Sequence, residues 1–322
     1  MATRILLTTT SFQDTPGAHH EYLKKSGFEV TTARGPLSEA QIFELVKKGD
    51  FDGLLNGDDQ ITATVIDAAL PRLRVIAKYG IGLDSIDVKY ATSKKIPVLY
   101  TPGVNHTTVA EHTFLLMLML AKHVWPHIRS TKQGEWKRMT GSELAGKTIS
   151  VLGVGRIGKE VIKRAVAFDM KVRGYDVYWD EAFAKEFNVT RVNSVIEAIS
   201  HSDVVSLHMN LDENNRGVIN KDTIAKMKKG AYLINTARGG LVVEKDVADA
   251  CRSKHLGGYG TDVVDKEPPE KDHVFREIDN VIVTPHVGSR TFESVERQAM
   301  RAVANLVNFL NGDKDFIQAN KF

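Results

Sequence analysis

The chain has 322 residues, of which 42% are hydrophobic and 26% are charged, and its formal net charge is +3. A chain of this length is longer than one hydrophobic core usually serves, so two domains are expected. The apolar content is typical of a soluble globular protein and excludes a disordered or fibrous chain. Pairs of lysines are scattered near the expected helix ends and form no stripe, which argues against nucleic-acid binding.

The chain has a single cysteine, Cys251, which rules out an internal disulfide and fits a reducing compartment. Its spacing from Val247 indicates packing on a helix face and not a reactive thiol. The N-terminal segment reads as a first strand and not as a secretory signal. The longest apolar run, residues 114–121, is far too short to span a bilayer. We therefore expect a cytoplasmic protein with no membrane contact.

Residues 4–101 alternate short apolar runs with helical stretches. The apolar runs, each read as a strand, are residues 5–10, 28–33, 51–56, 73–79 and 96–101. The helical stretches begin near Gly17, Ser38, Thr62 and Ser85. Repeated alternation of this kind predicts a parallel sheet with helices on both faces. This part of the sequence has no glycine fingerprint, so it is expected to serve something other than a dinucleotide.

A long helix is predicted over residues 107–129. It is apolar nearly all round, so it must be buried on several sides, either between domains or across a subunit interface. We interpret its apolar stripe as structural. His123 and His127 stand one turn apart, but Pro126 lies between them and no acidic ligand is near, so surface positions are predicted and no metal site. The segment 134–136 just beyond is a candidate arm that reaches a partner chain.

The stretch 148–176 carries the most informative motif of the chain. A buried apolar run is followed by Gly153-x-Gly155-x-x-Gly158, then by a helical stretch and a second strand that ends at Asp176. The glycines permit a tight turn, close approach of the backbone to a pyrophosphate, and close packing of helix on strand. An acid at the end of the second strand accepts hydrogen bonds from the ribose hydroxyls and repels a 2′-phosphate, so NAD is favoured over NADP.

A second strand series follows the fingerprint. Its runs are residues 202–209, 230–237, 257–263 and 280–286, and a final amphipathic helix covers about 291–311. Ligands of open parallel sheets bind beyond the carboxyl ends of the strands. Three of these strand ends deliver Arg238, Glu267 and His286 to the same rim.

These motifs together resemble the D-isomer-specific 2-hydroxyacid dehydrogenases over nearly the whole chain. The matching stretches are residues 78–87, 101–113, the fingerprint with Asp176, 235–240, 262–268 and 284–289. The resemblance implies an α/β fold of two doubly wound parallel sheets, with a Rossmann NAD-binding domain (103–286) inserted into a flavodoxin-like substrate-binding domain (1–102 and 287–322). It also implies a homodimer.

The resemblance and the chemistry of the side chains agree on three catalytic roles. His286 is the general acid in the reduction of a 2-keto acid and the base in the reverse direction. Glu267 pairs with this imidazole, which favours its charged form and raises its pKa. Arg238 holds the substrate carboxylate by two-point contact and polarises the keto oxygen. Asp262 is expected to bind the nicotinamide carboxamide.

Two further residue sets follow from the resemblance. The expected cofactor-binding residues are Gly153, Gly155, Arg156, Ile157, Gly158, Asp176, Met209, Thr236, Ala237, Arg238, Asp262, His286, Gly288 and Ser289. The expected substrate-binding residues are Lys78, Tyr79, Gly80, Ile81, Gly82 and Arg238. The backbone N–H groups of the glycine-rich turn at 80–82 are expected to hold the substrate carboxylate.

The substrate is expected to be a small anionic D-2-hydroxy acid or 2-keto acid. The chain looks most like the short phosphoglycerate dehydrogenases that lack a C-terminal regulatory domain, and Lys78 stands where these place a basic residue near the phosphate. Asp58 and Asp59 disfavour a phosphate, which leaves glyoxylate or hydroxypyruvate reduction as an alternative.

Two other functions occur on the same scaffold. The formate dehydrogenase branch pairs its histidine with glutamine and therefore fits Glu267 poorly. A nucleotide-sensing corepressor on the same scaffold is the alternative from another class. Those proteins carry long tails, whereas this chain begins at the first expected strand and ends about ten residues after the last expected helix, so the enzyme is preferred.

Overall fold

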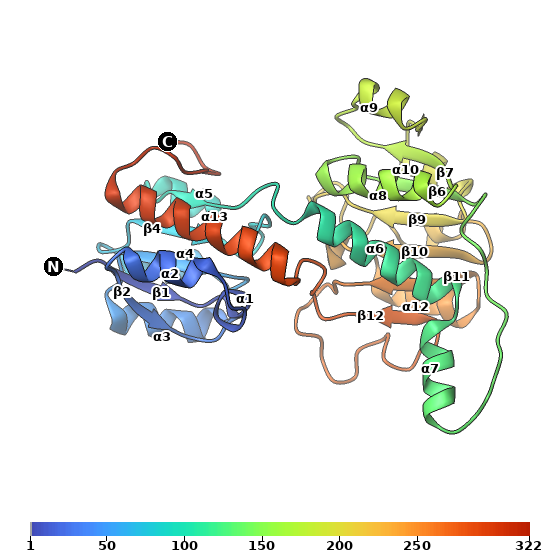
Figure 1. Cartoon of the computed structure of the whole chain (residues 1–322), viewed down its shortest axis with the longest axis horizontal. Coiled ribbons are helices and arrows are strands. Elements are labelled where there is room, and N and C mark those ends of the chain that lie inside the picture. The colour runs from blue at the N-terminus through green and yellow to red at the C-terminus, as the bar shows by residue number, and fades with distance from the viewer. Residues whose placement is uncertain (1) are drawn as a thin grey trace. The chain divides into compact units, whose positions relative to one another are not determined.

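The computed structural model describes residues 2–322 and divides them into two compact units. The first unit comprises residues 2–105 and 290–322, and the second comprises residues 106–289. The chain therefore leaves the first unit once, folds the second, and returns to the first (Figure 1).

The first unit holds a parallel sheet whose strand order, for the part of the chain described, is β2-β1-β3-β4-β5. Its strands are β1 (Arg4–Leu7), β2 (Glu29–Thr32), β3 (Gly53–Asn56), β4 (Val75–Lys78) and β5 (Val98–Leu99). Its helices are α1 (Thr10–Asp14), α2 (Ala18–Lys25), α3 (Glu39–Gly49), α4 (Ala63–Ala69), α5 (Val88–Ser93) and α13 (Phe292–Asn311). The order 2-1-3-4-5 is that of flavodoxin-like folds.

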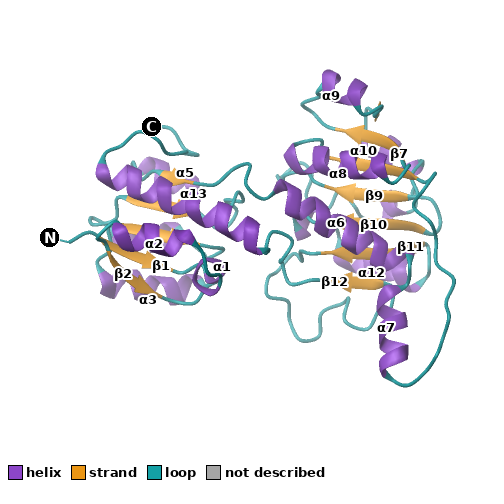
Figure 2. Ribbon diagram, viewed as in Figure 1, coloured by secondary structure: helices purple, strands orange, loops and turns teal. Residues whose placement is uncertain are grey.

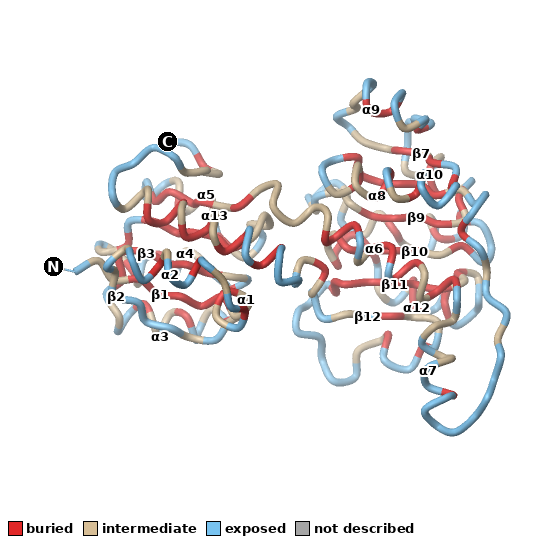
Figure 3. The backbone as a smooth tube through the Cα atoms, in the orientation of Figure 1, coloured by how far each residue is buried: buried red, intermediate tan, exposed pale blue. Residues whose placement is uncertain are grey.

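Both faces of this sheet are covered by helices, because side chains alternate along each strand (Figures 2 and 3). Leu6 and Ile76 point to a core shared with α3 and α4, whereas Ile5 and Val75 point to a core shared with α2 and α13. The buried face of α13, the last helix, therefore shares one core with β1, the first strand.

The second unit holds a larger parallel sheet, and among the described residues its order is β12-β11-β10-β9-β6-β7-β8. Its strands are β6 (Thr148–Leu152), β7 (Lys171–Tyr175), β8 (Thr190–Arg191), β9 (Val204–Leu207), β10 (Ala231–Asn235), β11 (Leu256–Thr261) and β12 (Val281–Val283). Counted from β6, this is the Rossmann order 3-2-1-4-5-6 with one strand added. The prediction of two doubly wound parallel sheets is confirmed.

The helices of the second unit lie on both faces of its sheet (Figure 2). They are α6 (His106–Ala121), α7 (Val124–Lys132), α8 (Arg156–Ala167), α9 (Glu181–Glu186), α10 (Val195–Ser200), α11 (Lys221–Ile224) and α12 (Glu244–Arg252), with a 3₁₀ turn η1 (Gly239–Leu241). One core contains residues of α6 and α8, and the other contains residues of α10, α11 and α12. Cys251 lies in the latter core, where burial raises the pKa of its thiol to about 12. The predicted packing role of this cysteine is confirmed.

The single long helix predicted over residues 107–129 is wrong, since the chain forms α6 and α7 with a break between them. His123 adopts a left-handed conformation, with φ 50°, at the break. In a continuous helix, the ring of Pro126 would clash with the carbonyl of residue 122. In α7 this proline occupies the first turn, where its missing N–H costs nothing.

The buried side chains of α6 pack on the sheet of its own unit, and its expected position between domains or across a subunit interface stays a prediction. A Cβ added at Gly258 would lie 2.8 Å from the Leu120 side chain, and one at Gly260 would lie 3.0 Å from that of Leu116. Two glycines of β11 therefore allow α6 to lie close against the sheet. Across residues 2–322, no helix is both long enough and apolar enough to cross a membrane.

Candidate active site

Three loops follow adjacent strands at the carboxyl edge of the Rossmann sheet. We call them the arginine loop (236–240, after β10), the glutamate loop (262–268, after β11) and the histidine loop (284–289, after β12). Because β10, β11 and β12 are neighbours in the sheet, the three loops leave it side by side. The sequence-predicted catalytic residues thus come from three consecutive strands.

The arginine loop is turned by the side chain of Asn235, the last residue of β10. Its Nδ2 donates to the carbonyl oxygen of Arg238 at 2.8 Å, and its Oδ1 accepts from the N–H of Ala237 at 3.0 Å. A Cβ on Gly239 would lie 2.0 Å from the carbonyl carbon of Val264. The missing side chain at Gly239 therefore lets the arginine loop pack directly against the glutamate loop.

Glu267 and His286 form a hydrogen-bonded pair. Nδ1 of His286 and Oε2 of Glu267 are 2.7 Å apart, and the two side chains are 41% and 36% exposed. The other carboxylate oxygen, Oε1, accepts from the N–H of Val264 at 3.1 Å, which fixes the orientation of the carboxylate. An acid–base side chain held by an oriented carboxylate at the edge of a sheet can give or take a proton.

The backbone of His286 is left-handed, with φ 52°, a conformation that few residues other than glycine adopt. Its N–H donates to the carbonyl oxygen of Asp262 at 2.9 Å. The histidine loop is therefore tied to the residue that begins the glutamate loop.

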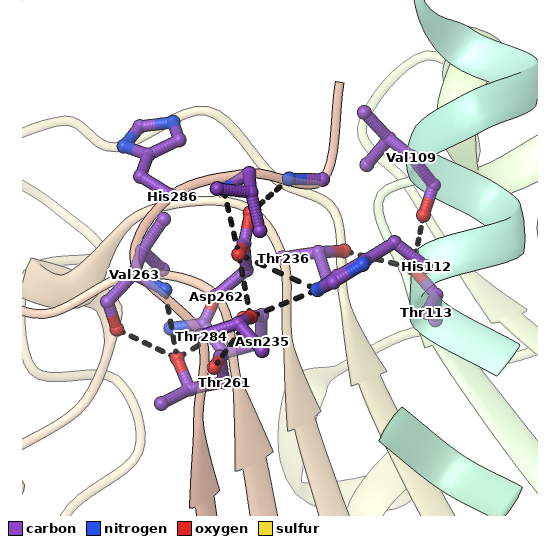
Figure 4. Close-up of polar contacts among 12 residues, drawn as sticks. Val109, His112, Thr113, Asn235, Thr236, Thr261, Asp262, Val263, Thr284 and His286 are labelled. Carbon is purple, nitrogen blue, oxygen red and sulfur yellow. Dashed lines mark hydrogen bonds and ion pairs between the residues drawn. The ribbon is translucent and has the colours of Figure 1, made fainter. Parts of the chain in front are cut away.

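Asp262 is the centre of this arrangement (Figure 4). The residue is 3% exposed. Its Oδ1 accepts from Thr284 Oγ1 at 2.6 Å and from the N–H of Val287 at 2.9 Å. Its Oδ2 accepts from the N–H of Gly288 at 2.7 Å. Burial by itself would raise the pKa of this carboxyl, but hydrogen bonds from His112, Thr284 and Val287 outweigh burial and lower it. Asp262 is therefore an ionised carboxylate that holds the histidine loop.

Two residues of α6 that the sequence reasoning treated as part of a structural stripe, or passed over, contact these loops. His112 Nε2 lies 2.8 Å from Thr284 Oγ1 and 3.4 Å from Asp262 Oδ1. The next residue, Thr113, is fully buried and shares a 2.9 Å hydrogen bond with Thr236 of the arginine loop. Adjacent polar residues within an otherwise apolar helix are the signal that was available in the sequence.

The dinucleotide fingerprint lies between β6 and α8, at the point where the strand order reverses. Gly153 has φ 98°, and a Cβ there would lie 2.6 Å from the carbonyl group of His208, while a Cβ on Gly158 would lie 2.0 Å from the Gly153 oxygen. Gly155 faces open space and caps α8 without a side chain, so the first-turn N–H groups of α8, including those of Arg156 and Ile157, suit a phosphate.

Asp176 is held at the end of β7 beside this loop. Its Oδ2 accepts from the N–H of Val154 at 2.6 Å and its Oδ1 accepts from the N–H of Tyr178 at 2.8 Å. Arg173 points instead to Glu197, with 3.5 Å between the guanidinium and the carboxylate. The residues present therefore fit a dinucleotide with an unphosphorylated ribose, as the sequence predicted. Met209, just after β9, is half-buried against the adjoining core.

In the first unit, the residues expected to bind substrate are the last residue of β4, Lys78, and the four that follow it. Lys78 is 2% exposed, and its Nζ donates at 2.6 Å both to Asp58 Oδ1 and to the carbonyl oxygen of Gly57. Tyr79 is buried, which raises the pKa of its phenol. The N–H of Gly80 donates to Thr101 Oγ1 at 3.0 Å, so this N–H is engaged within the chain.

Asp58 and Asp59, the two acids expected to disfavour a phosphorylated substrate, have different environments. Asp59 is fully buried, and its carboxylate accepts hydrogen bonds from Thr8 Oγ1 and from the N–H groups of Leu37 and Gly57. It therefore shapes the loop after β3. Asp58, by contrast, is 70% exposed and pairs with Lys78.

The fold and these loops define a dinucleotide-binding α/β protein that carries a histidine–carboxylate acid–base pair and an arginine at one edge of its Rossmann sheet. Residues 114–288 match the sequence profile of the NAD binding domain of D-isomer specific 2-hydroxyacid dehydrogenases. The chain belongs to this family, and the cofactor of the family's domain is NAD.

Curated relatives carry several names. The chain is 38% identical over 287 residues to the D-3-phosphoglycerate dehydrogenase of Methanocaldococcus jannaschii, covering 88% of this chain and 54% of that protein. It is also 38% identical over 289 residues to the hydroxypyruvate reductase of Thermotoga maritima, covering 88% of this chain and 92% of that protein. The chain thus spans about half the length of the matched phosphoglycerate dehydrogenases, 54% and 55%, and nearly all of the hydroxypyruvate reductase.

The fold is also similar to that of solved structures. The TT0316 protein of Thermus thermophilus superposes with a TM-score of 0.89 at 34% identity, covering 99% of this chain and 100% of that one. A putative D-isomer specific 2-hydroxyacid dehydrogenase from Polaromonas superposes with a TM-score of 0.88 at 26% identity, with 99% and 100% coverage.

Proposed function

We propose that this protein is an NAD-dependent oxidoreductase that interconverts a small D-2-hydroxy acid and its 2-keto acid. The observation that carries the proposal is the 2.7 Å pair of His286 and Glu267, on strand ends next to the one that bears Arg238. NADH, when bound, supplies a hydride for C2 of the keto acid. The reaction then needs one proton for the carbonyl oxygen and a cation for the carboxylate.

His286 supplies the proton. Its Nδ1 is engaged by the carboxylate of Glu267, so Nε2 is the ring atom that transfers a proton to the keto oxygen, and the hydroxyl group forms there. The carboxylate stabilises the imidazolium before transfer. In the oxidative direction, the same Nε2 takes the hydroxyl proton back.

Arg238 binds the substrate carboxylate. A guanidinium offers two parallel N–H donors to a carboxylate and keeps its charge at every physiological pH. Asn235 fixes the backbone of Arg238 through its carbonyl oxygen, at 2.8 Å. We also propose that Lys78, Tyr79, Gly80, Ile81 and Gly82 of the first unit contribute to substrate binding.

We favour a substrate whose tail carries no phosphate, such as glyoxylate or hydroxypyruvate, over 3-phosphoglycerate. The ammonium of Lys78 already lies 2.6 Å from the carboxylate of Asp58, so its charge is compensated within the chain. Relatives most of whose length this chain covers include the hydroxypyruvate reductase of Thermotoga maritima (92%) and the glyoxylate reductase of Thermofilum pendens (79%).

The test is NADH oxidation with glyoxylate, hydroxypyruvate and phosphohydroxypyruvate at equal concentrations. We expect turnover with the first two and a kcat/KM at least tenfold lower with the phosphorylated acid. Preference for the phosphorylated acid would contradict the substrate assignment. Tight NADH binding without turnover of any acid would favour the alternative, a nucleotide-sensing binding protein.

We propose further that the protein is a cytoplasmic homodimer. The segment after α7 exposes Trp136 to 79%, and α7 itself exposes Trp125 to 48%. Aromatic side chains of this size are enriched at interfaces between subunits. Sedimentation equilibrium of the wild type and of Trp136→Glu tests this assignment, with a monomeric wild type as the contradicting outcome.

A further inference from the structure

Two consecutive residues of α6 each contact a different catalytic loop. Thr113 bonds to Thr236 of the arginine loop at 2.9 Å, and His112 bonds to Thr284 of the histidine loop at 2.8 Å. We propose that His112 is a positioning residue for His286. The proposal rests on the acid–base role given to His286 under the proposed function.

The hydrogen-bond chain from His112 has a definite direction. The hydroxyl of Thr284 has one hydrogen, and the 2.6 Å distance to Asp262 Oδ1 shows that this carboxylate receives it. Oγ1 of Thr284 is then an acceptor toward His112, so Nε2 of His112 carries a hydrogen (Figure 4). The same N–H lies 3.4 Å from Asp262 Oδ1 and adds a favourable electrostatic contact. His112 therefore acts as a donor to the Thr284–Asp262 pair.

The pair in turn fixes the backbone on both sides of His286. Thr284 lies two residues before it, and Asp262 accepts from the N–H groups of Val287 and Gly288 directly after it, at 2.9 and 2.7 Å. A Cβ on Gly288 would lie 2.8 Å from Asp262 Oδ2, so only glycine permits this approach. The left-handed backbone of His286 is held by these contacts. Loss of the His112 donor leaves Oγ1 of Thr284 without this hydrogen bond, so one contact that restrains the loop is removed.

His112 is also well placed to act without touching the reacting atoms. Its side chain is 12% exposed and lies on the helix that packs against β10 and β11. Because the helix is packed on the sheet, a hydrogen bond from it can hold the histidine loop in a fixed position. His112 is therefore distinct from the general acid, and its removal is expected to lower kcat more than it raises KM.

The experiment compares His112→Leu, which has no donor, with His112→Gln, whose amide N–H can replace Nε2–H. His201→Leu is the matched control, because that histidine is exposed at the end of α10. We measure kcat and KM for hydroxypyruvate with NADH, the melting temperature, and hydrogen–deuterium exchange of the peptide that covers 284–289. We expect His112→Leu to lower kcat at least tenfold and to speed exchange of this peptide, and His112→Gln to keep kcat within about threefold of the wild type.

A normal kcat in His112→Leu, or equal losses in the Leu and Gln variants, would overturn the proposal. A lower melting temperature with unchanged exchange at 284–289 would also overturn it, because it would show a merely structural role. If His112→Leu does not fold, Thr284→Val against Thr284→Ser makes the same comparison. A wild type that reduces no keto acid refutes the proposed function, whereas the exchange experiment still decides whether His112 orders the loop.

Discussion

Oε2 of Glu267 accepts a hydrogen bond from Nδ1 of His286 at 2.7 Å, and the second oxygen of the same carboxylate is fixed by the N–H of Val264 at 3.1 Å. The imidazole is thus oriented through one ring nitrogen by a carboxylate that cannot rotate freely. Under the proposed function, this relationship leaves Nε2 of His286 as the ring atom that exchanges a proton with the substrate.

The first prediction concerns Glu267→Gln. A carboxylate favours the charged imidazolium, so the acid form of His286 persists to higher pH in its presence. The neutral amide removes this effect, and the alkaline fall of keto-acid reduction should begin at a lower pH. Activity is therefore lost most at alkaline pH. The measurement is the pH–rate profile of kcat/KM. Glu270→Gln, a change at an exposed acid paired with Lys266, serves as the control, and a profile for Glu267→Gln that overlays the wild type would refute the role.

The second prediction concerns Arg238→Lys. An ammonium keeps the charge but loses the two-point geometry, and charge-assisted hydrogen bonds contribute about 1.5–3 kcal/mol. We therefore expect KM for the keto acid to rise roughly 10-fold or more. Steady-state kinetics measure it. Arg216→Lys, at an exposed arginine paired with Asp265, should leave KM unchanged. Equal behaviour of the two variants would place Arg238 outside the substrate site.

The third prediction concerns the choice of cofactor. Asp176 carries the negative charge that disfavours a 2′-phosphate, while its hydrogen bonds to Val154 and Tyr178 shape the loop. Asp176→Asn keeps the size and part of the hydrogen bonding but removes the charge. We expect the ratio of kcat/KM for NADH over NADPH to fall at least tenfold. An unchanged ratio, with Asp222→Asn as the surface control, would show that another residue sets the preference.

The fourth prediction concerns stability in the first unit. Asp52 is 8% exposed and accepts from the N–H of Arg4 at 2.8 Å and from Arg72 at 2.9 Å. Burial alone would raise the pKa of Asp52, but these hydrogen bonds and the charge of Arg72 lower it. A carboxyl with a lowered folded-state pKa stabilises the fold above its unfolded-state pKa, and this contribution is lost as the pH falls through the folded-state pKa.

Asp52→Asn should therefore destabilise the protein by about 2 kcal/mol at neutral pH. The difference from wild type should shrink in strongly acidic solution. Thermal unfolding at neutral and acidic pH measures both effects. Asp50→Asn is the matched control, because Asp50 is 62% exposed and lies 3.4 Å from the same arginine. A loss for Asp52→Asn that is the same at every pH would contradict the assigned cause.

The fold class, the dinucleotide motif and the three side chains proposed as catalytic could all be predicted from the sequence. These features are local: strands and helices follow from the spacing of apolar residues, and Gly153, Gly155 and Gly158 are separated by a few positions of one turn. Arg238, Glu267 and His286 each follow a recognisable strand, and parallel strands place their carboxyl ends at one edge. Topology therefore brings these residues together without knowledge of side-chain contacts.

The break after α6 and the residues that support the three loops became visible only in the folded structure. His112 and Thr284 are 172 positions apart, so neither the spacing around His112 nor the pattern around Thr284 announces their hydrogen bond. Likewise, Asp58 just after β3 and Lys78 at the end of β4 form an ion pair, and the sequence around neither residue indicates it. Hydrogen bonds and ion pairs of this kind depend on distances between segments, which the packing of the sheet and its helices fixes only once the whole chain has folded.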